Sequence, residues 1–286
     1  MTERKALFCM WLASFLWGIT FIFQRLATGA LGALMFTGIR MLLGVACLFP
    51  FVYKELKKHL NDKEYIHTFI KASFECGFLV LISTLLQQYG LIYTTAGKAG
   101  FITSMYTVFV PVLSILSKKK VSAKMWIFVL VAVTGSFLIS FNGFNAGISR
   151  GDLLVFFCSI GFAFQIMAVD KYSKLFNSLA LCFGQFLVAG IVSLLLGLIF
   201  EKTNMQMIKG ALIPILYSGI FSCAIGYTLQ MVGQKYTTPT KATLVLSLES
   251  VWGLLAGLVF LGEALTFKEA VGCAMIFLSV LLSQLL

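Results

Sequence analysis

The second half of this chain repeats the first at a constant distance of 143 residues, half of its 286 residues. Residues 93–99 (YTTAGKA) return as residues 236–242 (YTTPTKA), and the same distance pairs Gln87 with Gln230 without a gap. The repeat therefore predicts two similar halves, residues 1–143 and 144–286, that pack against each other.

The composition places both halves in a membrane. Hydrophobic residues make up 59% of the chain and charged residues 12%, with a mean hydropathy of +0.96, whereas about 25% of the residues in a soluble domain are charged. Apolar runs close to the ~20 residues that a bilayer requires occur at 6–24, 33–53, 72–93, 97–117, 125–141, 152–169, 178–200, 211–234, 242–261 and 269–286. The sequence therefore predicts an all-α membrane protein with ten transmembrane helices.

The basic residues predict the orientation of these helices. If the N-terminus is cytoplasmic, six of the 22 Lys and Arg residues lie on the outer side, Arg40 lies within a span, and the other fifteen are cytoplasmic. This bias favours cytoplasmic N- and C-termini in the plasma membrane. The net charge of +11 is thus interpreted as a topology signal, and no nucleic-acid partner is expected.

Five spans in each half is an odd number, so the second half is expected to cross the membrane upside down relative to the first. Lys98 and its repeat partner Lys241 then lie on opposite faces. Inverted five-helix repeats can open a central site to one side and then to the other. The pattern favours a carrier that works by alternating access, and a duplicated static scaffold or channel is the alternative.

Several segments resemble EamA-type transporters of the drug/metabolite transporter superfamily, over nearly the whole chain. They are Trp17-Gly18, residues 93–103 running to Pro111, and residues 246–251 (LSLESV) followed by 261–263 (LGE). The resemblance implies ten helices in two repeats and a cavity lined by the first, third, fourth, sixth, eighth and ninth of them. Ser250 departs from the family pattern, in which many members have a proline and a local kink.

Glu249 is the strongest candidate for binding a substrate, because it lies about eight residues, or roughly 12 Å, into the ninth apolar run. A charge near the bilayer centre costs at least ~2.5–3.5 kcal/mol, which favours a functional role. Trp252 lies three residues further on the same helical face, and a carboxylate above an indole can hold a cation or an ammonium group. The alternative is a packing glutamate bonded to a neighbouring hydroxyl group.

Further candidates follow from the repeat. Tyr106 is the partner of Glu249, and an inverted repeat brings both positions to a similar depth, facing one cavity. Gln87 and Gln230 form another pair, and Tyr227 lies on the same face as Gln230. Unpartnered amides are costly in hydrocarbon, so these side chains should point into the protein, as substrate contacts or as interhelical hydrogen bonds.

Trp17, Phe21 and Trp252 are expected to form an aromatic wall of the cavity, although aromatic residues also pack membrane helices. Arg40 lies about seven residues, roughly 10 Å, into the second run. We expect it to be a structural clamp that extends to the outer rim, with binding of a substrate carboxylate as the alternative. Glu263 is expected to cap a loop, and Asp152 to stabilise the start of a helix.

The sequence favours transport of a small metabolite, with amino acids or related amines as the expected substrates. Export of hydrophobic organic cations and lipid flipping are alternatives. The sequence contains no Walker-type loop for ATP hydrolysis, and both histidines, His59 and His67, lie in a predicted loop, so an intramembrane enzyme is disfavoured. Neither a cofactor nor a metal is expected. The expected partners are the bilayer, the substrate and, unless transport is uniport, a coupling proton on Glu249; a monomer and a homodimer both remain open.

Overall fold

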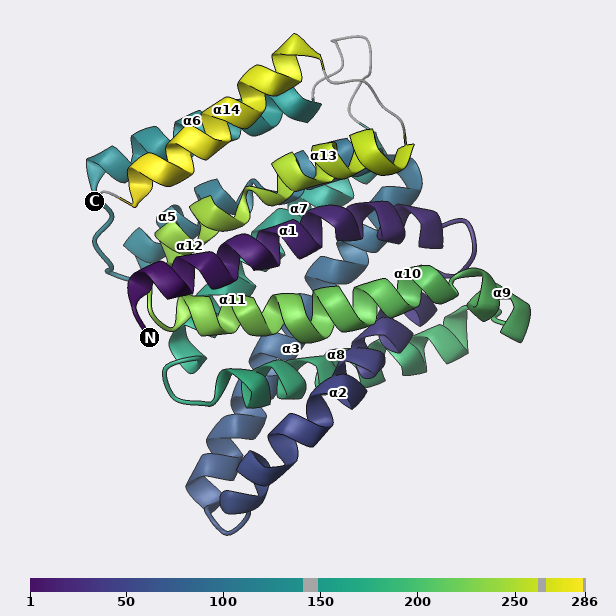
Figure 1. The fold of residues 1–286 in the computed structure, drawn as a ribbon. Coiled ribbons are helices and arrows are strands. Elements are labelled where there is room, and N and C mark those ends of the chain that lie inside the picture. The colour runs from purple at the N-terminus through teal and green to yellow at the C-terminus, as the bar shows by residue number, and fades with distance from the viewer. Residues whose placement is uncertain (141–148, 262–265, 285–286) are drawn as a thin grey trace.

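The computed structural model describes residues 1–140, 149–261 and 266–284, and these residues form helices joined by short connections (Figure 1). The first half contains α1 (Glu3–Ala27), α2 (Ala33–Lys58), α3 (Lys63–Tyr93), α4 (Ala96–Thr103), α5 (Tyr106–Leu116) and α6 (Ala123–Ser140). The second half contains α7 (Arg150–Tyr172), α8 (Ser178–Phe200), α9 (Met205–Gly210), α10 (Leu212–Tyr217), the π-helical segment η1 (Ser218–Gly226), α11 (Tyr227–Gln234), α12 (Pro239–Leu246), α13 (Glu249–Leu261) and α14 (Phe267–Ser283). The all-α prediction is confirmed for the described residues.

Eight helical stretches in the described part of the chain are long and apolar enough to cross a membrane. Three of these combine consecutive helices: α4 with α5, α10 with η1 and α11, and α12 with α13. The remaining two predicted spans correspond to α6 and α14, which have 18 and 17 residues. These two helices lie side by side (Figure 1), and the Ser279 hydroxyl donates to the Phe128 carbonyl at 2.6 Å. The predicted total of ten spans therefore requires that α6 and α14 also cross the membrane.

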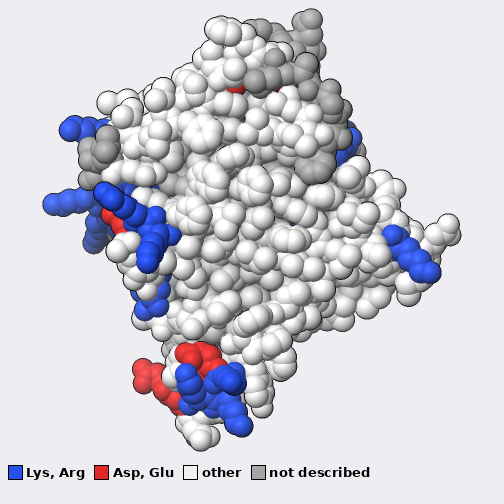
Figure 2. All heavy atoms as spheres, in the orientation of Figure 1, with Lys and Arg blue, Asp and Glu red and all other residues white. Residues whose placement is uncertain are grey.

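The surface agrees with a membrane protein. Figure 2 shows Lys and Arg gathered towards the ends of the molecule, with a broad uncharged face between them. Large apolar side chains are exposed on the membrane-spanning helices, for example Leu195, Leu198 and Ile199 of α8. Such exposure would be unfavourable in water but suits contact with lipid tails.

Two spans are interrupted at equivalent places in the two halves. The amides of Met105 and Leu248 each donate at 3.2 Å to the carbonyl three residues back, which tightens the backbone between α4 and α5 and between α12 and α13. After these turns, α5 begins at Tyr106 and α13 begins at Glu249. Interrupted membrane helices are tolerated where their ends are buried in protein or line a cavity.

The repeated Tyr-Thr-Thr segment has a local structural role, because its second threonine begins a half-helix. Thr95 accepts a hydrogen bond from the Lys98 amide at the start of α4, and Thr238 accepts one from the Lys241 amide at the start of α12. A threonine at this position satisfies a backbone donor that would otherwise have no partner. The motif therefore encodes the start of the interrupted span in each half.

Candidate functional site

A cavity lies where the two halves meet. The space open to the centre of a water-sized sphere is about 40 Å³, room for about three water molecules. Residues of α1, α3, α4, α5, α7, η1, α11 and α13 line the cavity, as the family resemblance implied for the corresponding spans, and α2 contributes as well. Seven of the residues predicted from the sequence line it: Trp17, Phe21, Gln87, Tyr106, Tyr227, Gln230 and Glu249.

Glu249 and Tyr106 meet directly in this cavity. The Tyr106 hydroxyl donates a hydrogen bond of 2.9 Å to Glu249 Oε1, and each residue is 3% exposed. Each is the first residue of a half-helix, and the tight turn before it supplies acceptors for the backbone amides that follow, such as the Ser247 carbonyl for the Ser250 amide at 3.2 Å. The Tyr106 hydroxyl thus gives the buried Glu249 carboxylate a hydrogen-bond partner, and the carboxylate has further lone pairs available to a ligand.

Glutamine pairs extend the polar lining in both halves. Gln24 of α1 donates to Gln87 of α3 at 3.0 Å, and Gln230 of α11 donates to Gln165 of α7 at 3.5 Å. The first helix of each half is thus joined to the third by amides that face the same cavity. The Oε1 atom of Gln230 is buried without a hydrogen-bond partner among the described residues. An unpartnered acceptor in this position suits a substrate or a water molecule.

An aromatic wall forms from Trp17 and Tyr227, whose ring centroids are 4.7 Å apart. Phe21 also lines the cavity and packs near Gly100 of α4. The indole Nε1 of Trp17 is buried and has no acceptor in the described part of the protein. The wall therefore combines apolar rings with one available hydrogen-bond donor.

Trp252 does not join this wall, in contrast to the prediction from the sequence. Its ring packs instead against Trp11 and Phe15, with centroid distances of 5.2 and 5.3 Å. The reason is the close approach of α1 and α13, where a Cβ added to Gly18 would lie 2.4 Å from the Trp252 Cβ. Three residues along a helix also correspond to about 60° around its axis, so Glu249 can face the cavity while Trp252 faces α1.

Arg40 lies inside the protein, whereas the sequence predicted a structural clamp that extends to the outer rim. Its side chain lines the cavity, is 4% exposed and lies over the Phe36 ring at 5.2 Å. Nε has no hydrogen-bond partner, and the guanidinium makes no ion pair with a carboxylate among the described residues. The cavity thus contains a buried cation as well as the Glu249 carboxylate.

Comparison with known proteins agrees with this architecture. The model of the EamA-like transporter family matches the chain twice, over residues 4–141 and 149–285. The chain belongs to this family. It is therefore a multi-pass membrane protein of a transporter family within the drug/metabolite transporter superfamily.

Related proteins support this assignment along nearly the full length. An uncharacterized transporter of Archaeoglobus fulgidus is 32% identical over 96% of this chain and 84% of its own length. The uncharacterized transporter YoaV of Bacillus subtilis is 22% identical over 91% of this chain and 90% of its own. A solved protein crystal structure has the same fold, with a TM-score of 0.81 at 15% identity, covering 100% of this chain and 98% of that one.

Two features of this EamA protein relate to the family pattern. The resemblance leads us to expect a proline at position 250, yet the break between α12 and α13 forms with Ser250 there, and the Ser250 hydroxyl donates to the Gly100 carbonyl at 3.5 Å. Glu263 lies outside the described residues, so its expected capping role stays a prediction.

Several lining residues were not predicted from the sequence, among them Gln24, Thr84 and Thr103. Thr84 is the repeat partner of Tyr227, so the 143-residue distance could have identified it. Gln24 lies at the end of the first apolar run, where a polar residue is ordinary. Ser222 and Cys223 line the cavity from η1. The signal for these two residues is the π-helical backbone, a feature that is frequent at functional sites and is visible only in the structure.

Proposed function

We propose that this EamA protein is a secondary carrier that moves an amino acid or a related small amine across the plasma membrane by alternating access. The observation that carries the proposal is the presence of Arg40 and the Glu249–Tyr106 pair in one cavity. A guanidinium is suited to a substrate carboxylate, and a buried carboxylate is suited to a substrate ammonium group. A zwitterion matches both charges at once.

The size of the cavity supports alternating access. A space for about three water molecules is too small to receive a metabolite without a movement of the surrounding helices. The inverted arrangement predicted from the odd number of spans per half supplies such a movement, because equivalent surfaces can exchange conformations. The proposal includes ten spans, with α6 and α14 as the fifth and tenth, and cytoplasmic termini.

Export of hydrophobic organic cations is the second candidate. The aromatic wall of Trp17 and Tyr227 and the Glu249 carboxylate would suit such a cation. Arg40 in the same cavity favours the zwitterion, since a buried guanidinium without a carboxylate partner repels a substrate that carries only positive charge.

The test compares three forms of one ligand: an amino acid, the amine made by removing its carboxylate, and the acid made by removing its amino group. Thermal stabilisation of the purified protein is measured for each, because a ligand that binds only the folded state raises the melting temperature. We expect the complete amino acid to stabilise the protein most. Equal stabilisation by the amine, together with export of organic cations from liposomes, would favour the second candidate.

Transport into liposomes then separates a carrier from a protein that only binds. We expect saturable uptake of the stabilising amino acid, with exchange of labelled for unlabelled substrate across the membrane. Binding without any transport in either direction would contradict the proposal.

A further inference from the structure

Two lysines at equivalent positions of the repeat each form an ion pair with the opposite half of the chain. Lys98 Nζ lies 3.5 Å from Asp152 Oδ2, and Lys241 Nζ lies 3.0 Å from Glu3 Oε1. Each lysine is in the first turn of a half-helix, α4 or α12, and each acid is in the first turn of the opposite half's first helix, α7 or α1. The same connection between the halves is thus built twice.

The two ion pairs lie at opposite ends of the bundle. Helix α1 has 25 residues and is therefore about 38 Å long. Glu3 at its start pairs with Lys241, whereas Arg25 near its end donates to the carbonyl of Leu91 in α3, shortly before α4 and Lys98. Figure 1 shows the N-terminus at the left end of α1 and the opposite end of that helix at the right.

Close backbone contacts accompany both ion pairs, again at equivalent positions. A Cβ added to Gly90 in α3 would lie 3.0 Å from the Gly151 carbonyl oxygen of α7. A Cβ added to its repeat partner Gly233 in α11 would lie 2.9 Å from the Ala6 carbonyl oxygen of α1. Each lysine therefore follows a helix, α3 or α11, that packs closely against the other half. The ion pair then joins the next half-helix, α4 or α12, to that half.

Each lysine also leads directly to the cavity. Tyr106 follows Lys98, and Glu249 follows Lys241, by the same number of residues through a short half-helix and its tight turn. A short half-helix thus connects Lys98 to Tyr106 (α4) and Lys241 to Glu249 (α12).

We propose that these ion pairs are two alternating latches on the ends of the central cavity. Each latch holds a cavity-lining half-helix against the opposite half, and it breaks when its end opens while the other latch stays closed. The proposal rests on the alternating-access function proposed above. Ion pairs that retain contact with water suit this role, because their small net contribution allows them to break and form during each transport cycle.

The acids of the two latches differ in burial and in their further hydrogen bonds. Asp152 also accepts a hydrogen bond of 2.5 Å from the Thr94 hydroxyl and is bonded to the Ser149 amide, and its side chain is 10% exposed. Glu3, in contrast, is 51% exposed. We therefore expect the Lys98–Asp152 latch to hold its end more firmly than the Lys241–Glu3 latch.

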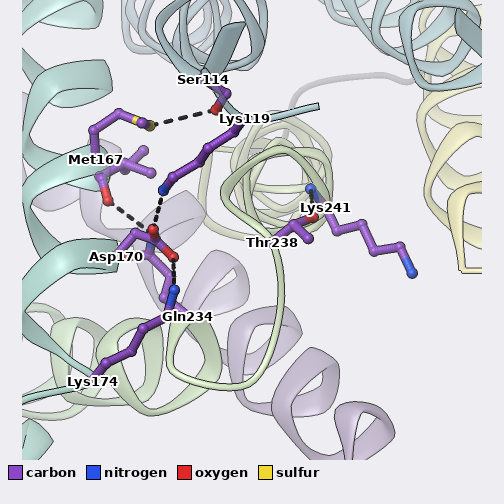
Figure 3. A network of polar contacts seen from close by, with 9 residues as sticks. Ser114, Lys119, Met167, Asp170, Lys174, Gln234, Thr238 and Lys241 are labelled. Atoms are coloured by element: carbon purple, nitrogen blue, oxygen red, sulfur yellow. Dashed lines mark hydrogen bonds and ion pairs between the residues drawn. The ribbon is translucent and has the colours of Figure 1, made fainter. Parts of the chain in front are cut away.

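A second ionic cluster lies at the Lys241 end and is separate from the latch. Figure 3 shows Lys119 and Lys174 directed at Asp170, while the Lys241 side chain points away from that cluster. Lys119 belongs to the first half and Asp170 to the second, so this cluster also joins the halves. Because Lys241 is not part of this cluster, a Lys241 variant should loosen its end without separating the halves.

The test measures access to the cavity from each side of the membrane. Cys223 lines the cavity and serves as the reporter in a variant whose six other cysteines are replaced. A small, charged thiol reagent that cannot cross the bilayer is applied to vesicles of either orientation, and the two labelling rates are compared. Lys98→Met and Lys241→Met each remove the charge and keep most of the apolar stem.

We expect opposite effects from these matched variants. Lys98→Met should change the ratio of the two labelling rates by about two- to fivefold in favour of the Lys98 end, the range that a partly exposed ion pair supports. Lys241→Met should change the ratio towards the other end. Lys235→Met is the control, because Lys235 lies six residues before Lys241 in the sequence and makes no ion pair with a described residue. Its ratio should stay at the wild-type value.

Exchanging the charges of one pair provides the rescue. Glu3→Lys combined with Lys241→Glu should return the labelling ratio to the wild-type value, whereas either change alone should not. The corresponding exchange at Asp152 is less suitable, because Asp152 also caps α7. Lys98→Met leaves that cap intact and tests the same latch.

Labelling ratios that do not change, or that change in the same direction in both variants, would overturn the latch proposal. The measurement requires no substrate, so its outcome is distinct from that of the proposed function. Unchanged labelling ratios together with normal amino-acid transport would contradict the latch proposal and leave the proposed function intact. Opposite changes in the ratio without amino-acid binding would support the latches and contradict the proposed substrate.

Discussion

Tyr106 and Glu249 occupy equivalent positions in the two halves, 143 residues apart, and the hydroxyl of the first donates a 2.9 Å hydrogen bond to the carboxylate of the second. Both follow a tight turn that interrupts a membrane span. The repeat therefore brings its own equivalent residues into contact at the centre of the protein. Because one is a phenol and the other an acid, the site is chemically asymmetric although the backbone repeats.

Glu249→Gln tests the role of this charge. The amide keeps the shape of the side chain and can still accept from Tyr106, so we expect the variant to fold. Affinity for amine-bearing ligands should fall about tenfold or more, the equivalent of about 1.4 kcal/mol. If Glu249 also carries a coupling proton, the dependence of transport on pH should disappear. Transport in liposomes over a pH series measures both effects, and unchanged affinity and pH response at normal yield would make Glu249 a packing residue.

Tyr106→Phe removes the hydrogen bond and leaves the buried carboxylate without this partner. Loss of a partner to a buried polar group costs about 1–3 kcal/mol, so the free energy of unfolding should fall by that amount. Tyr217→Phe is the control, since it removes a neutral bond of 3.2 Å to the Leu16 carbonyl and should cost about 0.5–1.5 kcal/mol. Thermal unfolding in detergent compares the two, and a smaller loss for Tyr106→Phe would argue against a charged Glu249.

Arg40→Met separates a substrate-binding arginine from a structural clamp. Burying a charge without an ion-pair partner is unfavourable, so replacing Arg40 with an apolar side chain of similar length removes a desolvation cost. We expect the ligand-free variant to be at least as stable as wild type. It should also lose its preference for the amino acid over the corresponding amine. A marked loss of stability with the preference retained would instead support the clamp predicted from the sequence.

Gly18→Ala tests the contact that directs Trp252 away from the cavity. The added Cβ would lie 2.4 Å from the Trp252 Cβ and 2.7 Å from the Gly253 amide nitrogen. Relieving this overlap requires α1 and α13 to separate, at a cost of about 1–3 kcal/mol. Gly253→Ala is a matched control across the same contact, because its nearest atom would be the Gly18 carbonyl oxygen at 3.5 Å. Equal melting temperatures for the two variants would contradict this packing.

Much of the site could be predicted because the bilayer and the repeat both leave patterns that can be recognised in the linear sequence. Hydrocarbon penalises every unpaired polar group, so a glutamate or glutamine deep in an apolar run must face the protein interior. The 143-residue distance then identified Tyr106 as the repeat partner of Glu249, and Gln87 as the repeat partner of Gln230, from the sequence alone. These residues do line one cavity.

The sequence by itself determined the membrane class, the two halves and the pairing of their polar residues, because apolar length and repeat distance are properties of the linear chain. Only the tertiary structure decided that Trp252 packs against α1, that Arg40 enters the cavity, and that Lys98 and Lys241 each pair with an acid of the opposite half. These outcomes depend on the rotation of each helix about its axis and on which helix lies beside it. Close contacts such as that of Gly18 with α13 set that rotation, and they join residues that are far apart in the sequence.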